Sequence, residues 1–275
     1  MLFMKYSLLA LDMDGTLLNS KHEISEPTIA AIEKAQAAGK EIVLSTGRCI
    51  AELREYFPVL PKLRYMVCVN GALIYDIKEQ KAIYSKPISA DGVGELLSKA
   101  HRDDVMVHFL SIESIVEKDK VIRMDRYAMA KYQDMFLNVT TKVDDIFEYF
   151  SADPHPVEKM NFYIGSAETR EAVEKQLDHE AFSITHADGY SIEITAKGIS
   201  KGTGLEILAD YLNIPLSEVI AAGDSDNDVS MLKKAGLAVA MKNSNANVHA
   251  VSDVCVSDCD HDGCAEIIYK YLLDD

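Results

Sequence analysis

The 275-residue sequence has no apolar run that approaches the roughly 20 residues of a membrane-spanning helix. Its apolar start, residues 1–10, is short and runs directly into Asp12, so we interpret it as a buried strand and not as a signal peptide. Basic residues are scarce, at 28 against 44 acidic ones, for a net charge of -16. A negative field of this kind repels nucleic acids and anionic membranes, so we expect neither as a partner.

Several nucleotide and hydrolase signatures are also missing. No G-x-G-x-x-G follows the first apolar run, which argues against dinucleotide binding, and neither a Walker A sequence nor a G-x-S-x-G elbow occurs. The five cysteines are an odd number in a chain too large to need disulfides, which indicates a reducing cytoplasm. Cys255, Cys259 and Cys264 lack the paired C-x2-C spacing of structural zinc sites, so we expect them to act as small apolar side chains.

The two ends of the sequence share one pattern. Apolar runs alternate there with segments of helical periodicity, which predicts a doubly wound α/β domain with a parallel sheet. Asn70-Gly71, between two apolar runs, predicts a two-residue hairpin turn. Strands are expected at 6–11, 41–44, 65–69, 72–75, 218–222, 237–240 and 254–256, and helices at 26–38, 51–57, 202–212, 227–234, 245–250 and 264–273.

The middle of the chain has a different pattern, which predicts an inserted α+β domain. We expect residues 1–84 and 190–275 to form the core and residues 85–189 the insert, with hinges near Lys86-Pro87 and Lys197-Gly198. Within the middle segment, helices are expected at 92–101, 124–135 and 167–177, and strands at 105–110, 114–118, 159–165 and 182–186. A further strand is expected at 190–195, where the chain would lead back to the core.

The strongest chemical signal is Asp12-Met13-Asp14-Gly15-Thr16, directly after the first expected strand. Open α/β sheets place their sites at the carboxyl ends of strands. Two carboxylates there can divide the work, one attacking an electrophile and the other donating a proton to a leaving group. A calcium-binding EF-hand loop is excluded, because its fifth and sixth positions would be Thr16 and Leu17.

A second acidic group, Gly223-Asp224-Ser225-Asp226-Asn227-Asp228, follows the expected strand at 218–222. Three aspartates in five residues repel one another and therefore require a cation or protons. The EF-hand pattern fails here too. One carboxylate from each of two strand ends suits octahedral magnesium, which also keeps waters and phosphate oxygens as ligands.

Two weaker signals accompany the acidic groups. Ser45-Thr46-Gly47 ends the second expected strand and can hold phosphate oxygens through a hydroxyl and backbone N–H groups. Lys201 stands at a helix start, where a cation is unfavourable unless an anion lies nearby.

Together these groups resemble the haloacid dehalogenase superfamily of phosphatases. The motifs D-x-D-G-T, S/T-G-R, K-G and G-D-x-x-N-D occur in that order, and the insertion lies between the second and third. With Asn70-Gly71-Ala72 and D-x-x-N-D-x-x-M at 224–231, the chain is similar to the Cof-type subgroup, which has a large α/β cap. The resemblance covers nearly the whole chain, although the cap matches only in layout.

The resemblance implies a magnesium-dependent phosphatase with a phosphoryl-aspartate intermediate. Mg2+ would be the cofactor, and the partner a small phosphorylated metabolite such as a sugar phosphate. Asp12 would be the nucleophile and Asp14 the acid and base. Thr46, Gly47, Asn70, Gly71, Lys201 and Asn227 would contact phosphate or substrate, Lys201 also being catalytic, and Asp12, Asp14, Asp224 and Asp228 would form the metal site.

Three other functions are weighed against this one. A phosphomutase generally carries a cap between the first two motifs, where only about thirty residues separate Asp14 from Thr46. A dehalogenase would lack Asp14, and a receiver-like signalling module would have no hundred-residue insert.

Lys159 and Asn161 share one strand face and could contact substrate, or that face could simply be exposed. The oligomeric state is not readable from the sequence.

Overall fold

The computed structural model of the protein describes residues 6–100, 102–186 and 189–273. The chain forms two compact units. The first contains the chain up to Gly47, Glu55–Tyr84 and the chain from Ser200 onward, and the second contains Arg48–Arg54 and Ser85–Ile199. Within the described residues, no helix combines the length and the apolar character that crossing a bilayer requires.

This division differs from the expected domain boundaries in two places. Residues 190–199 were expected in the core, but strand β11 (Ser191–Ala196) pairs with β9 (Lys159–Ile164) and β10 (Phe182–Thr185) in the second unit. Arg48–Arg54 was also expected in the core, and it too belongs to the second unit. The first difference arises from strand pairing, and the second from hydrogen bonds that Arg48–Arg54 makes with residues 112–114.

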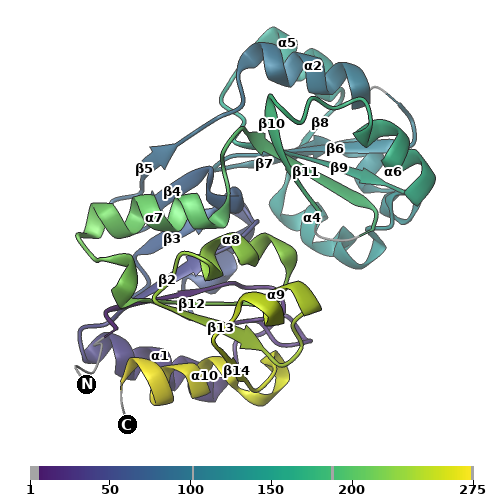
Figure 1. The fold of residues 1–275 in the computed structure, drawn as a ribbon. Coiled ribbons are helices and arrows are strands. Elements are labelled where there is room, and N and C mark those ends of the chain that lie inside the picture. Colours follow the sequence, from purple (N-terminus) through teal and green to yellow (C-terminus); the bar gives the residue numbers. More distant parts are fainter. Residues whose placement is uncertain (1–5, 101, 187–188, 274–275) are drawn as a thin grey trace. The chain divides into compact units, whose positions relative to one another are not determined.

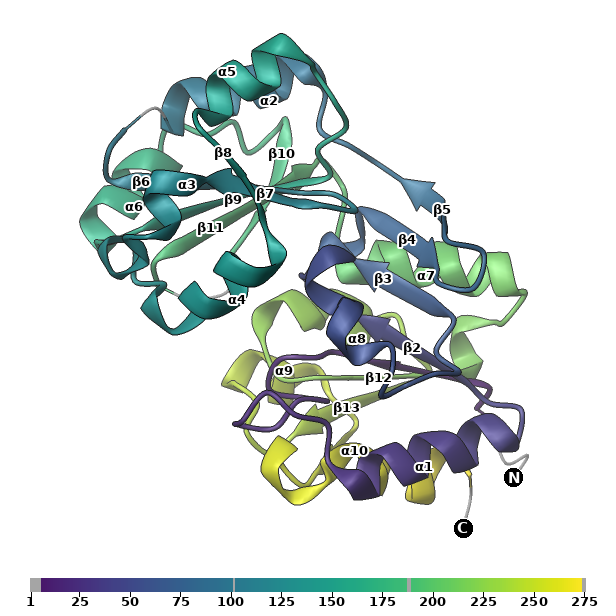
Figure 2. The same cartoon turned by 180° about the vertical axis from the view of Figure 1, so that it is seen from behind.

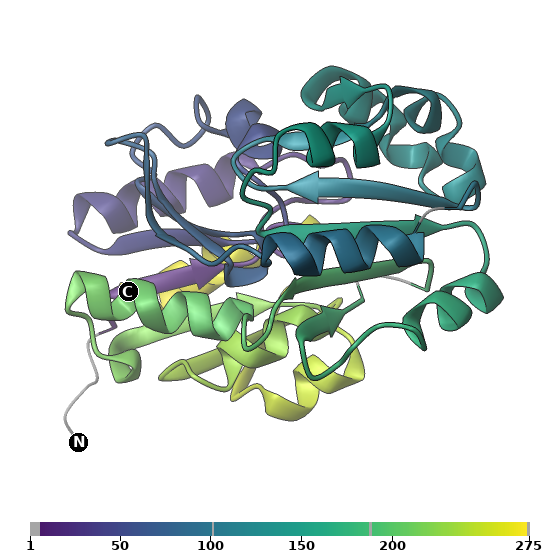
Figure 3. The same cartoon turned by 90° about the horizontal axis from the view of Figure 1, so that it is seen from above.

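The first unit is built on an eight-stranded sheet in the order β14-β13-β12-β1-β2-β3-β4-β5, parallel from β14 to β3. In Figures 1 and 3, α1 lies on one face of this sheet and α7 on the other, so the predicted doubly wound α/β class is confirmed. The strands are β1 (Leu8–Leu11), β2 (Glu41–Ser45), β3 (Tyr65–Cys68), β4 (Leu73–Asp76), β5 (Lys81–Ser85), β12 (Val219–Gly223), β13 (Leu237–Met241) and β14 (Val254–Val256).

Helix α1 shows how local sequence sets an element's ends. Ser25 caps its start by accepting from the Thr28 amide, Pro27 lies in its first turn, and Gly39 follows its end with a φ of 77°. The helices of the first unit are α1 (Glu26–Ala37), α7 (Lys201–Leu212), α8 (Val229–Leu232), α9 (Ala246–Val251) and α10 (Gly263–Ile267), which continues as the π-helix η8 (Ile268–Leu272). The short 3-10 helices are η1 (Ala51–Tyr56), η2 (Val69–Gly71), η5 (Leu216–Glu218), η6 (Asp226–Asp228) and η7 (Cys259–His261), of which η1 spans the unit boundary at Glu55.

The turn at Asn70-Gly71 is longer than predicted. Strands β3 and β4 do pair antiparallel, but the last pair is Cys68 with Leu73, so residues 69–72 form the turn and include η2. Strand β5 at the edge of the sheet was missed, because its apolar stretch Ala82-Ile83-Tyr84 is short and none of its side chains is fully buried.

The second unit has a six-stranded sheet in the order β10-β11-β9-β6-β7-β8, antiparallel except between β7 and β8. Figures 1 and 2 show α2 and α5 along one face and α4 on the other. The remaining strands are β6 (Val105–Leu110), β7 (Ser114–Glu117) and β8 (Thr141–Val143). The helices are α2 (Ala90–Ala100), α3 (Lys118–Val121), η3 (Met124–Tyr127), η4 (Ala130–Tyr132), α4 (Gln133–Val139), α5 (Ile146–Ala152) and α6 (Ala167–Glu174).

The predicted helix at 124–135 does not form. The chain instead makes the two short turns η3 and η4, and α4 begins only at Gln133. The break lies at Ala128, whose φ of 57° cannot occur inside a right-handed helix.

The two faces of the second sheet differ in polarity. One face belongs to an apolar core that includes Val107, Phe162 and Ile194. Neighbouring strands place His108, Asn161 and Glu193 side by side on the other face, where all three are buried. Because buried polar groups must be hydrogen-bonded, this second face carries a network of side-chain contacts.

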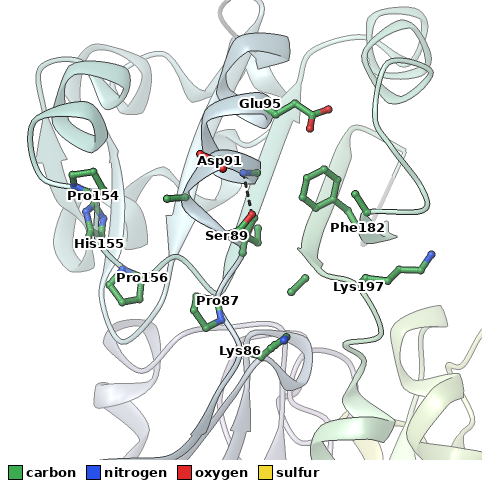
Figure 4. A pocket seen from close by; sticks show the side chains of 15 residues that line it. Lys86, Pro87, Ser89, Asp91, Glu95, Pro154, His155, Pro156, Phe182 and Lys197 are labelled. Atoms are coloured by element: carbon green, nitrogen blue, oxygen red, sulfur yellow. Dashed lines mark hydrogen bonds between the residues drawn. The ribbon is translucent and has the colours of Figure 1, made fainter.

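A pocket of about 800 Å³ lies wholly within the second unit. In Figure 4, Lys86 and Pro87 stand beside the start of α2, where Ser89 accepts from the Gly92 amide at 3.1 Å. The predicted hinge residues Lys86, Pro87 and Lys197 line it, but no residue that we predicted to carry chemistry does. The pocket is therefore distinct from the site predicted from sequence.

Candidate active site

Three adjacent parallel strands of the first unit position the predicted site. Asp12 follows β1, Thr46 follows β2 and Asp224 follows β12. Because β12, β1 and β2 are neighbours running in the same direction, their carboxyl ends lie at one edge of the sheet. Lys201 is the first residue of α7, and its side chain is buried.

A buried ion triad lies at the centre of this edge. The Lys201 Nζ donates to Asp12 Oδ1 at 2.5 Å and to Asp228 Oδ1 at 2.7 Å. All three side chains are at most 6% exposed. Charge-assisted bonds of this kind are stronger than neutral ones, so the triad holds the nucleophile candidate in one orientation.

Lys201 supplies less positive charge than the carboxylates around it need to stay ionised. Burial and the nearby Asp228 raise the pKa of Asp12 well above its usual range, against the opposing effect of Lys201. Burial and Asp228 also raise the pKa of Asp224 to about 6. Burial by itself would lower the pKa of Lys201, but the carboxylates of Asp12 and Asp228 keep it above its ordinary value. One lysine therefore cannot keep all these acids ionised at low cost.

The acids are arranged so that they could bind a metal ion. Asp12, Asp224 and Asp228 each offer a carboxylate oxygen, and these oxygens lie within 4.8 Å of one another. Gly15 makes the approach possible, because a Cβ there would stand 2.6 Å from Asp224 Oδ2. Thr16 Oγ1 donates to Asp224 Oδ1 at 3.1 Å and fixes its orientation. This all-oxygen donor set fits a hard divalent cation such as Mg2+.

Asp14 has a different environment from Asp12. Its side chain is 46% exposed, and its Oδ1 lies 3.8 Å from Nδ1 of His22. Two carboxyl groups two residues apart thus differ sharply in burial, which is the arrangement that allows one to act as a nucleophile and the other as an acid.

Thr46 and Asn70 lie on connected loops. The Thr46 amide donates to the Val67 carbonyl at 2.8 Å, and the Thr46 carbonyl accepts from the Asn70 amide at 3.1 Å. The amide of Thr46 is thereby used in the sheet, so a contact from Thr46 to a phosphoryl oxygen must come from its hydroxyl. Gly47, the next residue, is half-buried.

Gly71 and Asn227 have structural contacts of their own. A Cβ on Gly71 would lie 2.1 Å from the Ser200 carbonyl oxygen, so glycine lets this turn pack against the start of α7. The Asn227 Oδ1 accepts from Ser225 Oγ at 2.9 Å. Lys201 donates to Asp12 and Asp228, so these two aspartates orient the lysine.

Asp228 organises the second acidic loop. Its Oδ2 accepts from the amides of Asp224 and Ser225, both at 3.0 Å, while its Oδ1 accepts from Lys201. Both oxygens therefore already have donors, which makes Asp228 a support for the loop and for Lys201.

Sequence reasoning missed three supporting side chains. Thr16 belongs to the first acidic motif, but its hydrogen bond to Asp224 was not predicted. Asn243 Nδ2 donates to the Gly15 carbonyl at 2.7 Å, and Ser230 Oγ accepts from the Gly202 amide at 3.0 Å. For Asn243, a sequence signal was the polar run Asn243-Ser244-Asn245 after an apolar strand.

The C-terminal cysteines are not part of a group of potential metal ligands in the described part of the chain. Among the described residues, the single group of three or more potential ligands is the one of Asp12, Asp224 and Asp228. Cys255 is exposed, whereas Cys264 is buried and its thiol lies 3.4 Å from the Thr16 carbonyl oxygen. All five cysteines are free thiols.

Comparison with known proteins identifies the class. The profile of the haloacid dehalogenase-like hydrolases matches residues 9–268, and the chain belongs to this family. It is 30% identical to Phosphatase YwpJ of Bacillus subtilis, over 97% of this chain and 99% of YwpJ. It is 26% identical to the pyridoxal phosphate phosphatase YbhA of Escherichia coli, over 97% of this chain and 98% of YbhA.

A solved structure extends the comparison to the fold. The sugar phosphatase BT4131, of subclass IIB of the superfamily, is 27% identical with a TM-score of 0.80, over 95% of this chain and 97% of that structure. Within its family the protein is therefore a phosphatase of the Cof type. The mutase, dehalogenase and signalling alternatives receive no support from these relatives.

Proposed function

We propose that the protein is a magnesium-dependent phosphatase that hydrolyses small phosphate monoesters through a phosphoryl ester on Asp12. The observation that carries this proposal is the buried Asp12 carboxylate, held by Lys201 and close to the oxygens of Asp224 and Asp228. A nucleophile in this position needs no proton removed by a base, and the cation beside it offsets the charge of an incoming phosphate.

The reaction proceeds in two displacements. An oxygen of Asp12 attacks phosphorus, the bond to the ester oxygen breaks, and Asp14 gives that oxygen a proton. Water then attacks the same phosphorus while Asp14 takes up a proton, and the Asp12–phosphoryl bond breaks to release inorganic phosphate. The exposed position of Asp14 fits this exchange of protons.

The other site residues position the phosphoryl group. Lys201 and the Thr46 hydroxyl bind its oxygens, and Gly47, Asn70, Gly71 and Asn227 shape the surrounding loops. Asp12, the backbone carbonyl of Asp14 and Asp224 would hold Mg2+, with Asp228 in support. When bound, the ion would supply positive charge for the transferring phosphoryl group, which the chain's net charge of -16 repels.

The substrate is a small phosphorylated metabolite such as a sugar phosphate. Relatives include a sugar phosphatase and a pyridoxal phosphate phosphatase, which supports this range of substrates. We assign the choice of leaving group to the second unit, and we place the protein in the cytoplasm, where its free thiols stay reduced.

Magnesium-dependent release of inorganic phosphate is the test of this function. A panel of small esters, including sugar phosphates and pyridoxal phosphate, is incubated with the protein after removal of metal by chelation. We expect turnover only when Mg2+ is restored, with loss of at least ~10³-fold without it. Equal release with and without metal would show that the acidic cluster does not serve as proposed.

Lys159 tests the assignment of leaving-group choice to the second unit. The alternative of an exposed sheet face is wrong, because Lys159 is 1% exposed and its Nζ lies 2.9 Å from Glu193 Oε1. We expect Lys159→Ala to lower kcat/KM by ~10-fold for hydroxylated leaving groups and so to reorder the ester panel. Lys118→Ala, which removes an exposed lysine of the same unit, is the matched control. Unchanged kinetics for every ester would remove Lys159 from the proposal.

A further inference from the structure

One short segment connects the predicted phosphate-binding loop to the second unit. Arg48–Arg54 belongs to that unit, although the residues before and after it belong to the first. The segment directly follows Thr46-Gly47. Contacts that hold the segment therefore also restrict the backbone conformations available to Thr46.

The segment is fastened to the turn between β6 and β7. Three of its residues contact three consecutive residues, two in that turn and one at the start of β7, through a backbone bond, an exposed ion pair and a buried side-chain bond. The contacts are Ala51 N to the Ile112 carbonyl at 2.9 Å, Arg54 Nη2 to Glu113 Oε1 at 3.0 Å, and Ser114 Oγ to Glu52 Oε1 at 3.1 Å.

Of the three contacts, we expect the loss of the one made by Glu52 to have the largest effect on the segment. It is 4% exposed, and its Oε2 also accepts from the Cys49 amide at 3.3 Å. Arg54 and Glu113 are about half exposed, and a pair of that kind contributes little. Losing a partner of the buried Glu52 would instead leave polar groups unsatisfied.

Residues of the polar sheet face surround the carboxylate of Glu52 and hold it in place. Ser114 Oγ lies 2.7 Å from His108 Nε2. Burial, with the charge of Lys159, lowers the pKa of His108 to about 3, so the imidazole is neutral and does not compete as a cation. Burial raises the pKa of Glu52, while the charges of Arg48 and Lys159 lower it.

We propose that Glu52 is a positioning residue that acts through Thr46. By fastening Arg48–Arg54 to the start of β7, it restrains the loop Thr46-Gly47 from the C-terminal side, while β3 and the turn after it hold this loop through Val67 and Asn70. A phosphate-binding hydroxyl must be held to within about 0.5 Å. The inference rests on the proposed function in taking the Thr46 hydroxyl as a phosphate ligand.

Hydrogen exchange of the intact protein tests the anchor without any turnover. In Glu52→Ala and in Ser114→Ala, amides of residues 46–54 should exchange ~10-fold faster than in the wild type. Arg54→Ala, which removes the exposed ion pair of the same segment, should leave exchange unchanged. If faster exchange stops at residue 49 and does not reach Thr46-Gly47, or does not occur, the proposal is overturned.

A double-mutant cycle then tests whether Glu52 acts through Thr46. Glu52→Ala should lower kcat/KM ~10-fold in the wild-type background and by less than ~2-fold when Thr46→Val has already removed the hydroxyl. Independent, additive losses would show that Glu52 does not act through Thr46. A wild type that releases no phosphate would count against the proposed function, while the exchange measurement would still decide the anchor.

Discussion

Asp12→Asn is expected to abolish phosphate release while leaving the fold intact. The amide is nearly isosteric and its oxygen can still accept from Lys201, but it is not a nucleophile. We expect kcat to fall by at least ~10⁴-fold, as for other nucleophiles that act within a catalytic unit. Phosphate release under saturating Mg2+ measures the loss, and circular dichroism checks the fold.

A matched control separates nucleophile loss from a general loss of negative charge. Asp226 belongs to the second acidic motif but is exposed, and its Oδ1 accepts from the side-chain amides of Asn245 and Asn247. Asp226→Asn should therefore retain activity within ~2-fold of the wild type. Rapid quenching with a labelled ester should trap label on the wild type but not on Asp12→Asn. Substantial magnesium-dependent turnover by Asp12→Asn would rule out covalent catalysis at this residue.

Lys201→Met is expected to reduce both activity and stability. Methionine has a similar length but no charge, so the buried carboxylates of Asp12 and Asp228 lose their shared cation. Breaking a buried ion pair on one side costs roughly 3–5 kcal/mol of unfolding free energy. Loss of the phosphate-binding charge should lower kcat by at least ~10³-fold.

The stability loss in Lys201→Met should depend on pH. Burial and Asp228 already raise the pKa of Asp12, and Lys201 opposes that rise. Without the lysine the folded protein binds protons more tightly than the unfolded chain, so stability increases as pH falls. Urea unfolding without metal should show a smaller deficit at pH 5.5 than at pH 8. The exposed Lys233, changed to Met, is the control, and equal losses in the two variants would contradict the buried-triad account.

Local pattern explains which parts of the site were predictable. An apolar run followed at once by aspartate marks the end of a buried parallel strand, and this placed Asp12 and Asp224 at one sheet edge. Ser25, Pro27 and Gly39 likewise marked the ends of α1 within a few residues. These features depend on near neighbours in the chain, so they can be read directly from the sequence.

Features that depend on distant residues were not predictable in the same way. The edge strand β5 has only a short apolar stretch, and the break at Ala128 interrupts a segment with helical periodicity. Glu52 looks like an ordinary residue of a short helix until the fold brings Ser114 to it. Asn243 likewise contacts Gly15 only because two strand-end loops meet.

By itself the sequence determined the order of the elements, the doubly wound class and the acidic residues at the strand ends. Only the tertiary structure decided that Lys201 lies between Asp12 and Asp228, that Asp14 is exposed while Asp12 is buried, and that Arg48–Arg54 belongs to the second unit. The physical reason is that secondary structure follows from near neighbours. Burial, ion pairing and unit membership instead arise from contacts between residues far apart in the chain.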